Sequence, residues 1–177
     1  MGYVLRWLGI GVSTVVFTFL AFLALPLGVP ALTWVARTWS LTNLWLCGVK
    51  VVVEAPPVPL DAVAYVAMAT HSSHFDVMAV FGHAPINMRP VAKRELGYIP
   101  LFGWVLVAGA AIMIDRRNRR RAVASIRKAG ALIRSGSSVL MFPEGTRTPS
   151  GVVGPLKKGA FHLALEAQVP VLPIGVE

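Results

Sequence analysis

Residues 62–76, AVAYVAMATHSSHFD, decide the fold, because an apolar run there ends in a concentrated polar motif. The near-continuous apolar part, residues 62–70, is typical of a strand that a sheet buries on both faces. Similar runs occupy residues 50–55, 88–92, 110–115, 137–142 and 169–176. Between them, apolar residues recur at helical spacing over 119–135 and 156–168. Strands alternating with helices predict an α/β fold, with a mixed, partly parallel sheet flanked by helices.

An apolar amino-terminal segment precedes this pattern, with no charged residue from Trp7 to Ala36. Residues 7–25 would form a helix about 28 Å long, close to a bilayer core of about 30 Å. Pro26 ends that helix and Pro30 can begin a second one. Four of the five tryptophans lie in the first 45 residues, and tryptophan favours the membrane interface. We therefore expect a two-helix membrane-binding segment over 1–48. A cleaved signal peptide and a buried core helix are the alternatives.

The α/β domain is expected over 49–177. The chain stops at Glu177, directly after an expected strand. We therefore expect the domain to be truncated at its carboxyl end.

The composition narrows the class of partner. The chain is 55% hydrophobic and carries a net charge of +9, although only 14% of its residues are charged. Its mean hydropathy is +0.66. A basic and apolar chain favours an anionic membrane surface or an anionic substrate. Nucleic acid is not an expected partner, because no nucleic-acid-binding motif is present. The single Cys47 excludes an intrachain disulfide and is weakly indicative of a reducing compartment.

Three of the expected strands run directly into polar motifs. His71 to Asp76 follows the run at 62–70, Asp115 to Asn118 follows the run at 110–115, and Pro143 to Arg147 follows the run at 137–142. Because parallel strands end at one edge of a sheet, and ligands of open α/β folds bind there, these motifs are expected to converge on one crevice.

The two histidines of the first motif are not equivalent. Residues two apart on a helix point to opposite sides, so His74 cannot easily reach Asp76. His71 can reach Asp76 if it lies just before a helix that Ser72 or Ser73 caps. Asp76 would then accept a hydrogen bond from one ring nitrogen of His71 and leave the other as a base. His74 would lie on the surface or in the pocket wall.

Two other interpretations of this motif stay open. The first is a capped helix start with a solvated aspartate. The second is a metal site formed by His71, His74, Asp76 and His83, which neither an HExxH motif nor a cysteine pair supports. We expect no metal. A histidine base without a protein nucleophile fits direct transfer to a substrate hydroxyl.

Several cations are candidates for binding phosphate. Arg116 follows a strand end, Arg147 follows Glu144-Gly145-Thr146, and Lys93 follows the run at 88–92. Arginine binds phosphate oxygens in bidentate fashion. The alternatives are a solvated or lipid-headgroup-facing role for the arginine block at 116–121, and an exposed loop position for Lys93.

These motifs together resemble those of the glycerolipid acyltransferases, and within them the 1-acylglycerol-3-phosphate (lysophosphatidate) acyltransferases. The H-x4-D motif of that family matches His71 to Asp76. Its further motifs match AKRELGYIPLFGW at 92–104, IMIDRRNRRRA at 112–122, MFPEGTR at 141–147 and the region 156–176. The resemblance covers roughly residues 50–177. One departure is Thr70, where the family usually has asparagine.

The resemblance implies that His71 deprotonates the acceptor hydroxyl and that Asp76 orients His71. It implies that Lys93, Arg116 and Arg147 hold the acceptor phosphate, in a pocket shaped by Glu144, Gly145 and Thr146. The acyl donor would be a thioester of CoA or of acyl carrier protein, with no cofactor besides this co-substrate.

The resemblance also implies that the enzyme is membrane-associated, with its active site facing the cytoplasm. Two alternatives remain. One is an acyltransferase for glycerol 3-phosphate, another lysophospholipid or an aminolipid. The other is a basic membrane-binding protein without activity.

Overall fold

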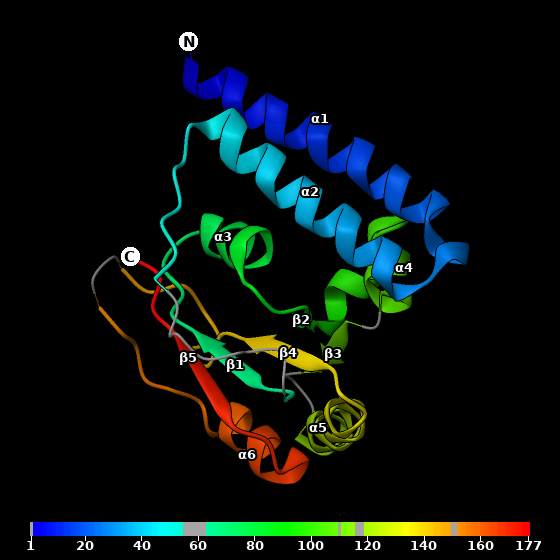
Figure 1. Ribbon diagram of the computed structural model, residues 1–177, viewed down its shortest axis with the longest axis vertical. Coiled ribbons are helices and arrows are strands. Elements are labelled where there is room, and N and C mark those ends of the chain that lie inside the picture. The colour runs from blue at the N-terminus through cyan, green and yellow to red at the C-terminus, as the bar shows by residue number, and fades with distance from the viewer. Residues whose placement is uncertain (1, 55–62, 110, 116–118, 150–151) are drawn as a thin grey trace.

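A five-stranded sheet forms the centre of the molecule, in the order β3-β2-β4-β1-β5 (Figure 1). The computed structural model describes residues 2–54, 63–109, 111–115, 119–149 and 152–177. The strands are β1 Val66–Ala69, β2 Met88–Lys93, β3 Ile112–Ile114, β4 Ser138–Met141 and β5 Val171–Ile174. All four pairings are parallel. The α/β class and the parallel character of the sheet are therefore confirmed.

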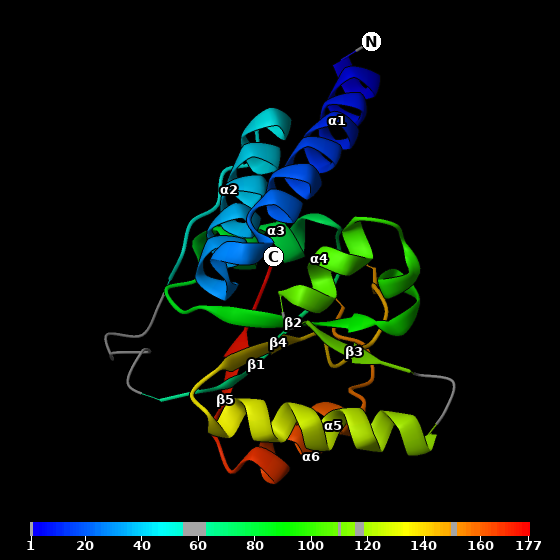
Figure 2. The same ribbon diagram turned by 90° about the vertical axis from the view of Figure 1, so that its right-hand side faces the viewer.

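Helices cover both faces of this sheet (Figures 1 and 2). One face packs on α5 Arg119–Arg134 and α6 Lys158–Ala167, in a core that includes Ile133, Val139 and Leu163. The other face packs on α3 Phe75–His83, through Val80 and Leu140. All residues of β1 and β4 are buried, as expected for central strands that lie between two helical layers.

An amino-terminal helical hairpin lies over the α3 side of the domain (Figure 2). It consists of α1 Gly2–Leu23, the short turn η1 Leu25–Leu27 and α2 Val29–Cys47. A cluster containing Ala21, Leu32 and Val35 joins its two helices, and α2 packs on α3. Helix α2 ends at Gly48, whose φ of 70° lies in the left-handed region that suits glycine. The hairpin is thus tied to the sheet through α3.

Helix α1 leaves most of its apolar surface uncovered. Tyr3, Val12 and Val15 are among its large apolar side chains that are more than half exposed. The helix is also long and apolar enough to cross a membrane. Both expected amino-terminal helices are present, although α1 begins at Gly2 rather than at residue 7. Its length and composition fit membrane association.

The remaining elements lie between β2 and β3. They are the 3-10 helix η2 Arg94–Tyr98 and helix α4 Phe102–Ala108. The sequence pattern did not predict α4, which is only 7 residues long. The expected strand at 50–55 is wrong for residues 50–54, which form no strand, and residue 55 lies outside the described residues.

Candidate active site

The carboxyl ends of β1 and β4 carry the two motifs that meet at the site. These strands are neighbours in the sheet, with Val66 paired to Val139 and Met68 to Met141. The chain therefore leaves β1 toward His71 at the same edge at which it leaves β4 toward Glu144. This convergence is the one expected for polar motifs that follow parallel strands.

His71 and Asp76 are in direct contact. The Nδ1 atom of His71 lies 2.9 Å from Oδ2 of Asp76, and Asp76 is only 3% exposed. An ionised carboxylate can only accept, so Nδ1–H donates and Nε2 is left as the basic nitrogen. The same Oδ2 accepts from the main-chain N–H groups of Ser72 and Ser73, at 2.7 and 2.8 Å. Three donors thus fix the carboxylate, and the carboxylate fixes the imidazole.

The serine cap expected for the following helix takes a different form. Helix α3 begins at Phe75, and its N-cap residue is His74, which makes no side-chain cap hydrogen bond. Ser73 instead accepts a 3.2 Å hydrogen bond from the N–H of Phe75. The Asp76 carboxylate, in the first turn, bonds the N–H groups of Ser72 and Ser73, so one group fixes both the loop before the helix and the histidine.

The main chain of His71 is held on both sides by the loop after β4. Its N–H donates to Oε1 of Glu144 at 2.9 Å, and its carbonyl accepts from the N–H of Thr148 at 2.9 Å. The imidazole also stacks on Phe142, with ring centroids 4.2 Å apart. His71 is therefore positioned by residues that follow two strands rather than by its own loop alone.

Glu144 is the centre of this hydrogen-bond network. Its carboxylate is buried, 3% exposed, and Oε2 accepts from the hydroxyl of Thr148 at 2.8 Å and from the N–H of Gly154 at 3.1 Å. Burial alone would raise the pKa of Glu144. The hydrogen bonds from Thr148, His71 and Gly154 outweigh burial and lower the pKa below its ordinary value of 4.5. Glu144 is thus held ionised as a positioning group.

Thr70 connects the dyad to the end of the chain. Its hydroxyl accepts from the N–H of Val176 at 2.8 Å and donates to the Val176 carbonyl at 3.2 Å. Its own N–H donates to the carbonyl of Ile174. The threonine that departs from the usual asparagine therefore makes a complete set of local hydrogen bonds beside His71.

A cavity of about 1100 Å³ opens beside the dyad. Its wall includes these expected site residues: His71, Lys93, Gly145, Thr146 and Arg147. Side chains of α1 and α2, such as Phe17 and Leu32, line another part of it. The cavity thus joins His71 and four basic side chains, Arg89, Lys93, Arg147 and Lys157, to an apolar region under the helical hairpin.

His74 lies in the cavity wall, as one of the two positions expected for it, and is exposed. Its ring meets Trp7 of α1 edge-on, with centroids 6.5 Å apart. Burial, then the positive charge of Arg147, lowers the pKa of His74. Arg147 is therefore close enough to His74 to disfavour its protonated form.

Not every expected site residue is brought into the cavity. Arg116 lies outside the described residues. Glu144 is not among the cavity-lining residues and faces the loop network instead. Asp115 accepts a hydrogen bond from Arg94 at 3.2 Å. Among the described residues, no three histidine, cysteine, aspartate or glutamate side chains are grouped as metal ligands.

Sequence reasoning missed Thr148 and Lys157. Thr148 bonds Glu144 and His71, and Lys157 lies in the cavity wall. A threonine four residues after a buried glutamate carries no recognisable pattern. Lys157 directly precedes the exposed Lys158 at the start of a helix, and the sequence pattern does not distinguish the two lysines.

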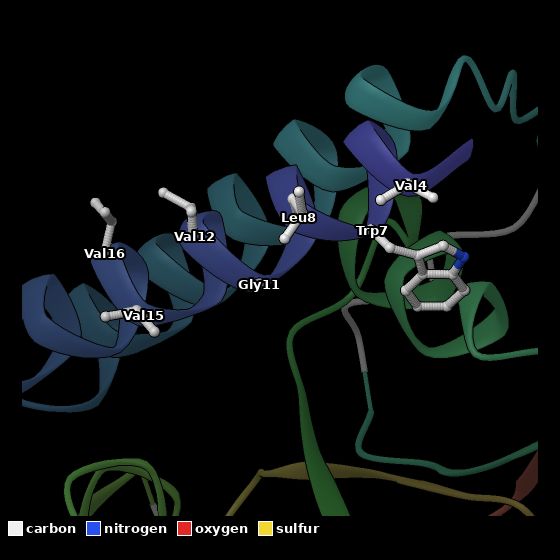
Figure 3. A pocket seen from close by; sticks show the side chains of 7 residues that line it. All are labelled: Val4, Trp7, Leu8, Gly11, Val12, Val15 and Val16. Atoms are coloured by element: carbon white, nitrogen blue, oxygen red, sulfur yellow. The ribbon is translucent and has the colours of Figure 1, made fainter. Parts of the chain in front are cut away.

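A second, apolar hollow of about 560 Å³ runs along the outer face of α1 (Figure 3). It is lined by Val4, Trp7, Leu8, Gly11, Val12, Val15 and Val16. Figure 3 shows these side chains projecting from the helix, and six of them are 44–70% exposed. The hollow is therefore part of the exposed apolar surface of α1.

The fold and the site define an α/β protein with a hydrogen-bonded histidine–aspartate pair at the carboxyl edge of a parallel sheet. Residues 52–177 match the Acyltransferase family model. The chain belongs to the Acyltransferase family, which confirms the resemblance of its motifs.

Curated relatives support this assignment. The chain is 38% identical over 115 residues to an uncharacterized acyltransferase of Schizosaccharomyces pombe, covering 63% of this chain and 41% of that protein. It is 35% identical over 132 residues to a 1-acyl-sn-glycerol-3-phosphate acyltransferase of Limnanthes alba, covering 74% and 46%. A match to 1-acyl-sn-glycerol-3-phosphate acyltransferase alpha of Homo sapiens has 34% identity over 141 residues, covering 79% and 50%. The chain spans about half the length of these relatives.

A solved structure shares the fold. The crystal structure of the 1-acyl-sn-glycerophosphate (LPA) acyltransferase PlsC from Thermotoga maritima superposes with a TM-score of 0.75 and 23% sequence identity. The match covers 96% of this chain and 72% of that one. The match includes the helical hairpin as well as the sheet, because it spans nearly the whole chain.

Proposed function

We propose that this protein transfers a fatty acyl group from a thioester of CoA or acyl carrier protein to the sn-2 hydroxyl of lysophosphatidate, giving phosphatidate. The observation that carries the proposal is the His71–Asp76 hydrogen bond beside a cavity that also contains Lys93 and Arg147. Relatives named as 1-acyl-sn-glycerol-3-phosphate acyltransferases support the choice of acceptor.

In the proposed reaction, Nε2 of His71 removes the proton from the acceptor hydroxyl. The hydroxyl oxygen then attacks the thioester carbonyl, and the carbon–sulfur bond breaks as the ester forms. His71 returns the proton to the departing thiolate, so the base is regenerated. Asp76 keeps the proton on Nδ1 and stabilises the imidazolium while it exists.

The cations serve the acceptor's phosphate. Lys93 and Arg147 line the cavity, and charge-assisted hydrogen bonds to phosphate oxygens would fix the hydroxyl near His71. Glu144 acts indirectly, because its carboxylate is occupied by His71, Thr148 and Gly154. The reaction needs no cofactor beyond the thioester co-substrate.

The hairpin would bring the cavity to the lipid. Helix α1 exposes apolar side chains, while α1 and α2 also line the cavity. The acceptor could therefore enter from the bilayer without crossing water. The net charge of +9 would favour an anionic membrane surface. The site would face the cytoplasm, where acyl-CoA and acyl carrier protein are found.

The test is an acyl-transfer assay on the purified protein in phospholipid vesicles. Lysophosphatidate, glycerol 3-phosphate and lysophosphatidylcholine are compared as acceptors, each with acyl-CoA and with acyl carrier protein thioester. We expect phosphatidate from lysophosphatidate, lost in His71→Ala. If only glycerol 3-phosphate or only lysophosphatidylcholine is acylated, lysophosphatidate is not the acceptor and that molecule takes its place in the proposal. If none of the three acceptors is acylated, the proposed acyltransferase activity is contradicted.

A further inference from the structure

Lys157 lies against the turn that carries the cavity's arginine. It is the N-cap residue of α6, and its N–H donates to the carbonyl of Pro143 at 2.8 Å. Its side chain passes over Gly145. A Cβ atom placed on Gly145 would lie 2.5 Å from Nζ of Lys157 and 3.0 Å from both Cδ and Cε. The lysine therefore occupies the space that any side chain at position 145 would need.

Gly145 is required here for two separate reasons. Its φ of 70° lies in the left-handed region, which other residues adopt only with strain. It also has no side chain to displace Lys157. The turn is thus shaped so that the Lys157 ammonium lies close to the main chain two residues before Arg147.

Lys157 is exposed and borders the cavity, and it has no ion-pair partner among the described residues. Lys157 lines the same cavity as His71, Lys93 and Arg147. The neighbouring Glu144 carboxylate already accepts hydrogen bonds from His71, Thr148 and Gly154. Within the described part of the chain, the recorded ion pairs are His71–Asp76 and Arg94–Asp115, and neither includes Lys157. Its donors are therefore available to an anion in the cavity.

We propose that Lys157 is a phosphate-binding residue of the cavity, acting with Arg147, which lies two residues after Gly145 in the same turn. The identity of that phosphate rests on the proposed function, since both substrates carry one. It is either the phosphate of the lipid acceptor or a phosphate of the CoA donor. The chemistry is the same in both cases: an ammonium point charge opposite a phosphate oxygen.

The chain offers a closely matched control. Lys157→Met keeps the aliphatic stem over Gly145 and removes only the charge, whereas Lys157→Arg keeps the charge. Lys158 is the next residue, and both lysines are exposed, but only Lys157 is among the residues that line the cavity. Lys158→Met therefore removes the same net charge from the same helix start without changing the cavity wall.

Equilibrium binding measures the contribution directly, without turnover. Lysophosphatidate and its phosphate-free counterpart monoacylglycerol are titrated in the same detergent micelles by calorimetry. Coenzyme A and phosphate-free pantetheine form the second pair. We expect Lys157→Met to weaken the binding of one of the two phosphate-containing ligands by about 10- to 150-fold. Lys157→Arg should restore part of this affinity. Neither phosphate-free ligand should change, and Lys158→Met should bind as wild type.

The pair that responds identifies the source of the phosphate. Unchanged binding of both phosphate ligands by Lys157→Met would overturn the proposal, as would an equal loss in Lys158→Met. Gly145→Ala tests the same contact without removing the lysine. The added Cβ should displace the Lys157 side chain and so weaken binding of the same phosphate ligand. Turnover is assayed separately. A wild-type protein that binds lysophosphatidate through Lys157 but does not acylate it would contradict the proposed function alone.

Discussion

The main-chain N–H of His71 donates a 2.9 Å hydrogen bond to Oε1 of Glu144, across 73 positions of sequence. The bond joins the segments that follow two neighbouring strands, so it fixes His71 relative to the turn before Arg147. Thr148 completes the connection by bonding both the His71 carbonyl and the Glu144 carboxylate. The proposed base and the proposed phosphate-binding arginine are thus carried by segments that are fixed relative to each other.

Replacing the general base should nearly abolish turnover. His71→Ala is expected to lower kcat by about 10²- to 10⁴-fold, the usual contribution of a positioned base. His74→Ala is the matched control, since His74 lies in the same cavity wall but does not contact Asp76. Steady-state acyl transfer in vesicles measures both. Equal losses in the two variants would remove His71 from its assigned role.

Arg147 should act on acceptor binding. If its contact is equally strong in ground and transition states, Arg147→Ala raises KM for lysophosphatidate by about 10- to 150-fold with little change in kcat. Arg147→Lys should recover only part, because lysine lacks the planar fork. The exposed Arg120 of α5 provides the control. If KM rises for acyl-CoA and not for the lipid, the arginine binds the donor instead.

Glu144→Gln should destabilise the loop network. A glutamine has one acceptor oxygen, so it cannot serve the donors on both sides of the present carboxylate. One buried donor is left unpaired, at a cost of about 1–3 kcal/mol in the free energy of unfolding. Denaturant unfolding measures it, with the exposed Glu166→Gln as control. A loss no larger than that of Glu166→Gln would contradict the positioning role.

The same carboxylate predicts a pH dependence. The pKa of Glu144 is lower in the folded protein than its ordinary value of 4.5. Its stabilisation is therefore present above about pH 4.5 and is lost as the pH falls through the folded-state pKa. The difference in unfolding free energy between wild type and Glu144→Gln should be constant near neutral pH and narrow below pH 4.5. A difference that widens on acidification would reverse this assignment.

Membrane association should depend on the exposed face of α1. Val15 is 70% exposed on α1, and Leu165 is 67% exposed on α6, on the far side of the sheet. A lysine in the middle of a lipid-facing helix costs about 2.5–3.5 kcal/mol. Val15→Lys should therefore float less with vesicles in a density gradient than Leu165→Lys, which should behave as wild type. Equal flotation of the two variants would show that the exposed face of α1 does not bind the bilayer.

The sequence predicted all five strands of the sheet, although only β1 and β4 are buried throughout and β5 is partly exposed. β1 and β4 are apolar runs that are buried throughout, so their composition reports their environment directly. The run at 50–54 has similar β-branched residues, yet Val52 is 85% exposed and pairs with no strand. Composition alone cannot show whether a partner strand is present.

The site divides in the same way. The His71–Asp76 contact could be predicted because both residues lie at one helix start, where local geometry decides. The structural role of Glu144 could not be predicted, because the sequence does not distinguish a buried carboxylate from one that binds substrate. Only the position of Thr148 and Gly154 around it distinguishes them.

The place of β1 between β4 and β5 has a consequence for the order of events during synthesis. The buried residues of β1 leave the ribosome well before the strands that flank them, since Tyr65 and Ser138 at the start of the β1–β4 pairing are 73 positions apart. At roughly 5–20 residues per second, β1 waits about 4 to 15 s for its first partner. During that time its edges are unpaired and open to aggregation. Helices α1 and α2 are already made, so the nascent chain can be held at the bilayer while the sheet assembles behind it.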